Sequence, residues 1–113
     1  MKKKIRVLPP SMREKKRYLL VELLSKKPLK ISKKELSKEL NNFFLSFFGI
    51  FGFSKMGIKL IEWNPNTNEL ILKSSLHAYE NIAAALQFLK EIQNIKVIPI
   101  CKRISGTIKG LKA

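Results

Sequence analysis

Residues 58–74 read IKLIEWNPNTNELILKS, and this stretch carries the clearest structural pattern in the sequence. Two runs rich in apolar residues, 58–63 and 69–74, flank the segment Asn64-Pro65-Asn66-Thr67-Asn68. Asn side chains hydrogen-bond their own backbone and Pro fixes φ, so this composition is typical of a turn. The pattern therefore predicts an antiparallel hairpin of two strands.

The segment before the hairpin predicts a strand and a helix. Residues 17–24 alternate, which places Leu19, Val21 and Leu23 on one face of a strand. Ser32 and Glu35 then have the spacing of a capping box, which begins a helix. Gly49 and Gly52 predict its end. The apolar face expected of this helix consists of Leu36, Leu40, Phe43, Phe44 and Phe47.

The segment after the hairpin predicts a second helix and a last strand. The helix is expected over residues 78–92 and the strand over residues 95–104. Pro99 lacks an N–H group, so this strand is expected at a sheet edge. Ser105-Gly106-Thr107 then opens a short basic helix or turn. The inward residues expected in the second helix are Ile82, Ala85, Leu86, Leu89 and Ile92.

The order strand, helix, strand, strand, helix, strand predicts an α+β, ferredoxin-like sandwich with the topology of RNA-recognition-motif proteins. One four-stranded antiparallel sheet would carry two main helices. We interpret residues 1–113 as a single domain. It comprises a basic N-terminal extension (1–16), a core (17–104) and a basic C-terminal cap (105–113).

Charge is the strongest compositional signal. The 113 residues hold 23 Lys and Arg against 8 acidic residues, a formal net charge of +15. A polyanion relieves such self-repulsion, so nucleic acid is the expected partner. The competing interpretation is that the positive charge only keeps the protein soluble or reflects a proteome-wide basic bias. No apolar stretch approaches the ~20 residues of a membrane-spanning helix, and we expect a cytoplasmic protein that binds no membrane.

The sequence offers no catalytic constellation. His77 is the only histidine, and Cys101, the only cysteine, is expected to be a buried small hydrophobe. Clustered metal ligands are not evident in the sequence. We therefore expect no catalytic residue, no metal site and no cofactor bound by the protein itself.

RNA is expected to contact basic residues rather than stack on the sheet. The third strand lacks aromatic residues and the first offers only Tyr18, whereas RNA-recognition motifs stack bases on sheet aromatics. Whether the N- and C-terminal basic clusters form one patch stays open, as does the choice between a phosphate site and a simple cap at Gly106 and Thr107. The predicted RNA-binding residues are Lys4, Arg6, Arg13, Lys15, Lys16, Arg17, Lys73, Lys102, Arg103, Gly106, Thr107, Lys109 and Lys112. The predicted protein-contact residues are Tyr18, Leu20, Phe48, Phe51 and Phe53.

The two ends of the chain resemble the archaeal RNase P protein component 2 family, which has relatives in eukaryotic RNase P. Residues 8–18 read LPPSMREKKRY, similar to that family's opening, and residues 104–109 read ISGTIK, similar to its segment after the last strand. Gly57 to Trp63 and Ala83 to Leu86 fit between them. Lys73 departs from the arginine that the family often carries near the end of the third strand, which removes a planar fork for phosphate.

The resemblance implies a subunit of RNase P, which removes the 5′ leader from precursor tRNA. It implies that the RNA and its Mg²⁺ perform the chemistry. The implied partners are RNase P RNA, precursor tRNA, the component 3 protein and other RNase P proteins, and a homodimer is compatible with it. The alternatives are another basic RNA-binding module, such as a ribosomal or ribosome-assembly protein, and a nuclease that acts alone.

Overall fold

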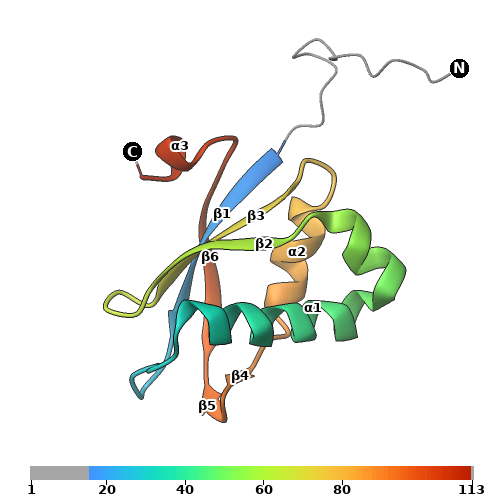
Figure 1. Ribbon diagram of the computed structural model, residues 1–113. Coiled ribbons are helices and arrows are strands. Elements are labelled where there is room, and N and C mark those ends of the chain that lie inside the picture. The colour runs from blue at the N-terminus through green and yellow to red at the C-terminus, as the bar shows by residue number, and fades with distance from the viewer. Residues whose placement is uncertain (1–15, 113) are drawn as a thin grey trace, which may run out of the picture.

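The structure, a computed structural model, describes residues 16–112 (Figure 1). A four-stranded antiparallel sheet has the strand order β2-β3-β1-β6, and α1 and α2 cover one of its faces. The predicted α+β, ferredoxin-like fold is confirmed. The elements are β1 (Lys16–Leu24), α1 (Lys33–Met56), β2 (Lys59–Asn64), β3 (Glu69–Ser75), α2 (Tyr79–Leu86), β4 (Glu91–Ile92), β5 (Ile95–Lys96), β6 (Ile98–Ser105) and α3 (Ile108–Lys112).

The hydrophobic core lies between the sheet and the two longer helices. Leu19 and Val21 of β1 lie opposite Leu72 and Leu70 of β3, and these four side chains are buried. Because side chains alternate along a strand, the intervening residues of β1 lie on the other face. We call that other face, which α1 and α2 leave uncovered, the open face.

Helix α1 begins as predicted but continues beyond its predicted end. The Ser32 hydroxyl accepts a hydrogen bond from the Glu35 amide at 3.1 Å, and the Glu35 carboxylate accepts one from the Ser32 amide at 3.2 Å. Gly49 interrupts the helix at φ 80° and ψ 173°, a conformation essentially restricted to glycine. The chain re-enters the helix and ends at Met56, before Gly57 at φ 62°. The predicted end at Gly49 and Gly52 was therefore wrong, because Gly49 makes a kink.

The second predicted helix was too long. Helix α2 ends at Leu86, and the β4–β5 hairpin occupies the end of the predicted range. Gln93 and Asn94 both have positive φ, 51° and 66°, which is the requirement of a two-residue type I′ turn. All five residues predicted to face inward from residues 78–92 are nevertheless buried.

Strand β6 is shorter at its start than predicted, because residues 95 and 96 belong to the small hairpin. It lies at the sheet edge, as Pro99 predicted. Leu20 of β1 lies opposite Arg103, whereas Val21 lies opposite Cys101. Lys102 is thus the extra residue of a β-bulge, which directs Lys102 and Arg103 to the same face.

Helix α3 packs on the open face. Its Leu111 is 2% exposed, and it lines a recess with Leu20 and Ile71 of the sheet. The segment predicted to be a short helix or turn is a helix, and it covers part of the face that α1 and α2 leave bare. Among the residues that the structure describes, no helix is both long and apolar enough to cross a membrane.

Candidate nucleic-acid interface

Three lysines gather at one end of the open face, where β1 and β2 begin and β3 ends. Lys59 lies directly opposite Lys73, and Lys73 lies opposite Tyr18. Lys16 shares a face with Tyr18, two residues further on, so it is the diagonal neighbour of Lys73. We call Lys16, Lys59 and Lys73 the lysine cluster.

The lysine cluster is electrostatically strained. The charge of Lys16 lowers the pKa of Lys73, and burial, a side-chain hydrogen bond with Lys16 and the charge of Lys59 lower this pKa further. Like charges this close disfavour the protonated form. An anion placed among the three ammonium groups relieves the repulsion, so the cluster suits a phosphate group.

The start of β1 and the end of β6 meet beside this cluster, because the two strands are antiparallel neighbours. Tyr18 lies opposite Ser105. A Cβ placed on Gly106 would lie 3.5 Å from Nη1 of Arg17, which shows how near the two segments are. In the structure Arg17 therefore lies beside the start of the C-terminal basic segment, a relationship that the sequence left open.

The loop before α3 already uses some of its polar groups. The Thr107 amide donates to the Ser105 hydroxyl at 3.2 Å, and the Gly110 amide donates to the Thr107 hydroxyl at 3.0 Å. These are capping interactions within the chain. Two alternatives were predicted at Gly106 and Thr107, a phosphate site and a simple cap, and these contacts are those of a cap. Lys109 lies exposed on the helix that follows.

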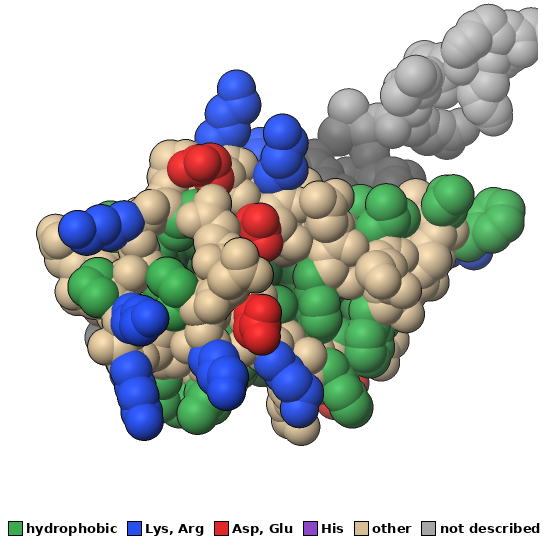
Figure 2. All heavy atoms as spheres, turned by 90° about the horizontal axis from the view of Figure 1, so that it is seen from below, with side chains coloured by type: hydrophobic (Ala, Val, Ile, Leu, Met, Phe, Trp, Pro, Cys, Tyr) green, Lys and Arg blue, Asp and Glu red, His purple; other side chains and the backbone are tan. Residues whose placement is uncertain are grey.

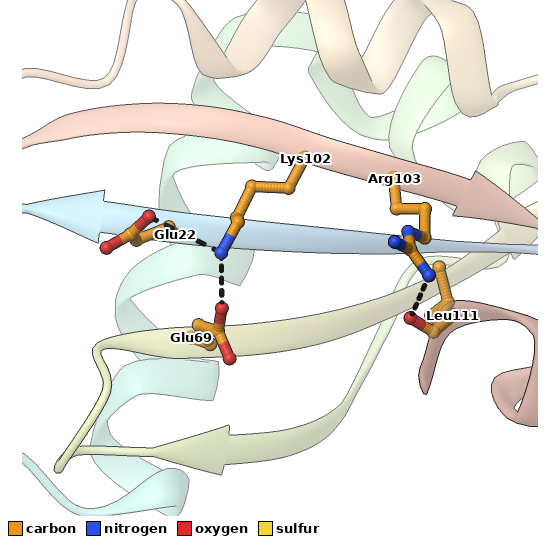
Figure 3. A network of polar contacts seen from close by, with 5 residues as sticks. All are labelled: Glu22, Glu69, Lys102, Arg103 and Leu111. Atoms are coloured by element: carbon orange, nitrogen blue, oxygen red, sulfur yellow. Dashed lines mark hydrogen bonds and ion pairs between the residues drawn. The ribbon is translucent and has the colours of Figure 1, made fainter. Parts of the chain in front are cut away.

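Three other predicted RNA-binding residues hold parts of the protein together. Lys102 Nζ lies 2.7 Å from a Glu69 carboxylate oxygen and 3.7 Å from one of Glu22 (Figure 3). The hydrogen bond with Glu69, followed by the Glu69 charge, raises the pKa of Lys102. Because two carboxylates flank this lysine, its charge is largely compensated within the protein.

The other two of these predicted RNA-binding residues, Arg103 and Lys112, hold α3 in place. Arg103 donates from Nη1 to the Leu111 carbonyl oxygen at 3.3 Å (Figure 3). Lys112 Nζ lies 2.9 Å from a carboxylate oxygen of Glu62. A guanidinium and an ammonium near the last carbonyls of a helix also suit its dipole. These residues thus anchor the helix on the sheet.

The predicted protein-contact residues divide into two groups. Tyr18 and Leu20 are half-buried on the open face, and Leu20 lies near Leu111 of α3. Phe48 and Phe53 pack partly against the core. Phe51 is 82% exposed and is the member of this set with the most accessible side chain.

The sequence reasoning missed most of the exposed apolar side chains at the end of α1 and just beyond α2. Phe47 was assigned to the core, but it is 46% exposed and its ring lies 5.4 Å from the ring of Phe88. Phe88 is 61% exposed and Ile50 is 76% exposed. We call Phe47, Ile50, Phe51 and Phe88 the phenylalanine patch. The feature of the sequence that could have predicted this patch was the position of Phe88, which lies outside the apolar stripe of the second helix.

Lys59 was also missed as a member of the basic site. Its signal was its position at the start of the first strand of the hairpin, because the turn at residues 64–68 brings the start of this strand opposite the end of β3. Conversely, Lys4, Arg6, Arg13 and Lys15 lie outside the described residues.

Neither His77 nor Cys101 belongs to a cluster of reactive groups in the part of the chain described. Within residues 16–112, no group of three His, Cys, Asp or Glu residues is placed to hold a metal ion. Cys101 is exposed on the edge strand, so the expectation of a buried cysteine was wrong. Partial desolvation nevertheless raises the pKa of its thiol.

Comparison with known proteins identifies relatives over nearly the whole chain. A model of the Rpp14/Pop5 family matches residues 17–113. "Ribonuclease P protein component 2" of Archaeoglobus fulgidus is 32% identical over 105 residues, which cover 93% of this chain and 92% of that protein. The protein of the same name from Thermococcus gammatolerans is 32% identical and covers 99% of this chain and 92% of its own length.

The fold also has a counterpart among solved structures. A chain in the cryo-EM structure of yeast ribonuclease MRP superimposes with a TM-score of 0.67 at 11% identity. The match covers 82% of this chain and 75% of that chain. At this identity the similarity is one of fold.

Proposed function

This chain belongs to the Rpp14/Pop5 family, and we propose that it is a protein subunit of ribonuclease P, the ribonucleoprotein that removes the 5′ leader from precursor tRNA. The family that the two ends of the sequence resemble is confirmed. Family membership implies RNA and other protein subunits as partners. The observation that carries the proposal is a match covering more than nine-tenths of both this chain and the relative from Archaeoglobus fulgidus.

The lysine cluster is the part of the described surface best suited to RNase P RNA. Lys16, Lys59 and Lys73 lie on one face, and their mutual repulsion lowers the pKa of Lys73. Each phosphate that they neutralise releases counterions and favours binding. The cluster contacts backbone rather than base edges, because ammonium groups on a strand position RNA without reading its sequence.

In this proposal the protein shapes the RNA and the RNA performs the cleavage. The Mg²⁺ ions of the reaction are bound by the RNA, and the protein holds the RNA fold by neutralising its phosphates. Precursor tRNA is the substrate of the assembly. The proposed location is the cytoplasm.

The phenylalanine patch supports a protein partner. Four large apolar side chains, between 46% and 82% exposed, belong to residues 47–51 of α1 and to Phe88 just beyond α2, and the rings of Phe47 and Phe88 lie 5.4 Å apart. In Figure 2 hydrophobic side chains also gather toward the right-hand edge, on the side where the end of α1 lies in Figure 1. Exposed apolar groups of this size mark protein contacts. We assign this surface to the component 3 protein of RNase P. A homodimer is less favoured, because each copy carries a net charge of +15.

The experiment is precursor-tRNA cleavage by RNase P RNA and the other protein subunits, with and without this chain, at modest Mg²⁺. We expect the chain to restore 5′-leader removal and to cut nothing alone. A variant with Lys16, Lys59 and Lys73 all changed to Gln should fail at modest Mg²⁺ and recover at higher Mg²⁺, which replaces the lost phosphate neutralisation. The matched control changes Lys33, Lys34 and Lys38 to Gln, three exposed lysines of α1.

Two outcomes would contradict the proposal. If the chain changes no cleavage but still binds structured RNA in a salt-dependent way, the ribosome-associated alternative takes its place. If the purified chain cuts precursor tRNA without RNase P RNA, it is a nuclease in its own right.

A further inference from the structure

An open groove lies at the end of the sheet opposite the lysine cluster. It has a volume of about 890 Å³ and runs between the loop that follows β1 and the β4–β5 hairpin. Leu24 and Lys16 are the two ends of β1, so the groove and the cluster are separated by about 26 Å at ~3.3 Å per residue. They are therefore two separate surfaces.

The floor of the groove is aliphatic and partly exposed. Ile98 of β6 lies opposite Leu24 of β1, and the two are 64% and 41% exposed. Ile95 of the hairpin adds a third aliphatic side chain to the lining. Burying these side chains against a partner removes apolar surface from water, which favours binding.

The rim of the groove is basic. Lys26 and Lys27 lie on one wall, and Lys90 and Lys96 lie on the other, with Glu91 the single acidic residue of the lining. Within residues 16–112 none of these four lysines forms an ion pair. Figure 2 views the molecule from this end and shows Lys and Arg side chains beside hydrophobic ones, with acidic side chains among them. Glu91 lies opposite Lys96 in the β4–β5 ladder, so the rim offers an excess of positive charge, rather than positive charge alone, around an apolar floor.

Both walls are held by hydrogen bonds before any partner arrives. The Ser25 hydroxyl donates to the Lys27 carbonyl oxygen at 2.6 Å, which fixes the loop after β1. The Val97 amide donates to the Lys90 carbonyl oxygen at 2.9 Å, which closes the base of the β4–β5 hairpin. A preformed groove loses little conformational entropy on binding.

We propose that this groove binds a short acidic segment of a partner protein that also carries aliphatic side chains. Carboxylates of the segment would pair with the four lysines, and its aliphatic side chains would cover Leu24, Ile95 and Ile98. RNA fits this lining less well, because a phosphate backbone that pairs with the lysines would leave the aliphatic floor in water, and the lining contains no aromatic or guanidinium plane on which a base could stack. The inference is independent of the ribonuclease P assignment.

The test measures binding of a fluorescent peptide of alternating Glu and Leu to the full chain at physiological salt. The double variant Lys90→Glu/Lys96→Glu should weaken binding about tenfold or more, because it reverses one wall of the rim. Its matched control, Lys33→Glu/Lys38→Glu, makes the same change of net charge on exposed α1 and should stay within about twofold.

A second pair of variants tests the floor without changing charge. Ile98→Ser should weaken binding, whereas Leu45→Ser, at a residue of α1 that is 40% exposed and lies outside the phenylalanine patch, should leave it unchanged. Both side chains are exposed, so the fold is retained, and thermal unfolding checks this. A peptide with Ser in place of Leu should bind less tightly than the original peptide.

Three results would overturn the inference. Equal loss in the groove variant and its charge control would mean non-specific attraction to a basic protein. Equal binding of the Ser and Leu peptides would leave the aliphatic floor without a role. The third result is a single-stranded RNA that displaces the peptide and whose own binding is weakened by Lys90→Glu/Lys96→Glu and by Ile98→Ser. This result would make the groove a nucleic-acid site. Because the test contains no RNase P RNA and no cleavage, its failure leaves the proposed function untouched.

Discussion

Lys16 and Lys73 lie diagonally across the β1–β3 ladder, and the charge of Lys16 is the largest cause of the lowered pKa of Lys73. A structural role would favour a carboxylate beside one of these lysines. Lys102, on the same sheet, has two such carboxylates. Lys73 therefore lies among like charges, whereas the charge of Lys102 is already neutralised within the protein.

The salt dependence of RNA binding should distinguish these two lysines. Lys73→Gln should weaken the binding of RNase P RNA and reduce the slope of log K against log salt by about 0.7–0.9, the value for one lost phosphate contact. Lys102→Gln should change the slope far less, because Glu22 and Glu69 compensate its charge. Filter binding over a salt series measures both slopes, and equal slopes for the two variants would contradict the assignment.

Lysine reactivity should follow the pKa directions. A lowered pKa gives Lys73 a larger neutral fraction below 10.5, the ordinary value, whereas the raised pKa of Lys102 gives a smaller one. When the protein is treated with a limiting amount of acylating reagent at increasing pH, Lys73 should therefore be modified at a lower pH than Lys102. Peptide mass spectrometry measures the extent of modification of each lysine. Lys16→Gln should slow acylation of Lys73, and Glu69→Gln should speed acylation of Lys102. The reverse order of modification would refute the electrostatic description.

Leu111 should be the anchor of α3. A helix of five residues is not stable alone, so its packing on the open face must hold it. Leu111→Ala should lower the free energy of unfolding by about 2–3 kcal/mol and speed amide exchange in α3. Lys109→Ala, on the exposed side of the same helix, is the control. Unchanged exchange in Leu111→Ala would show that Arg103 and Lys112 suffice to hold the helix.

Gly49 should be required for the kink of α1. A Cβ placed there meets nothing within 4 Å, so an Ala would strain the backbone at φ +80° without a steric clash. Gly49→Ala should cost about 1–3 kcal/mol of stability, measured by urea unfolding. Ser46→Ala, at an exposed position of the preceding turn, should have little effect. If Gly49→Ala is as stable as the parent, α1 can straighten, and the position of Phe51 should then change.

Local patterns in the sequence determined much of this protein. The hairpin of residues 58–74, the capping box at Ser32 and the edge position of Pro99 rest on turn chemistry, hydrogen-bond spacing and a missing donor, which act over a few residues. The two ends of the chain also carried the family resemblance. The kink at Gly49 and the turn at Gln93 and Asn94 were missed, because glycine and asparagine permit several backbone conformations and packing selects among them.

Tertiary structure alone decided the roles of the charged residues. Lys73 and Lys102 are equally basic in the sequence, and both were predicted to bind RNA. Strand pairing placed Lys73 beside Lys16 and Lys59, whereas the bulge in β6 directed Lys102 toward Glu22 and Glu69. The interaction between two charges depends on the distance between them, and only the register of strands far apart in the sequence sets that distance.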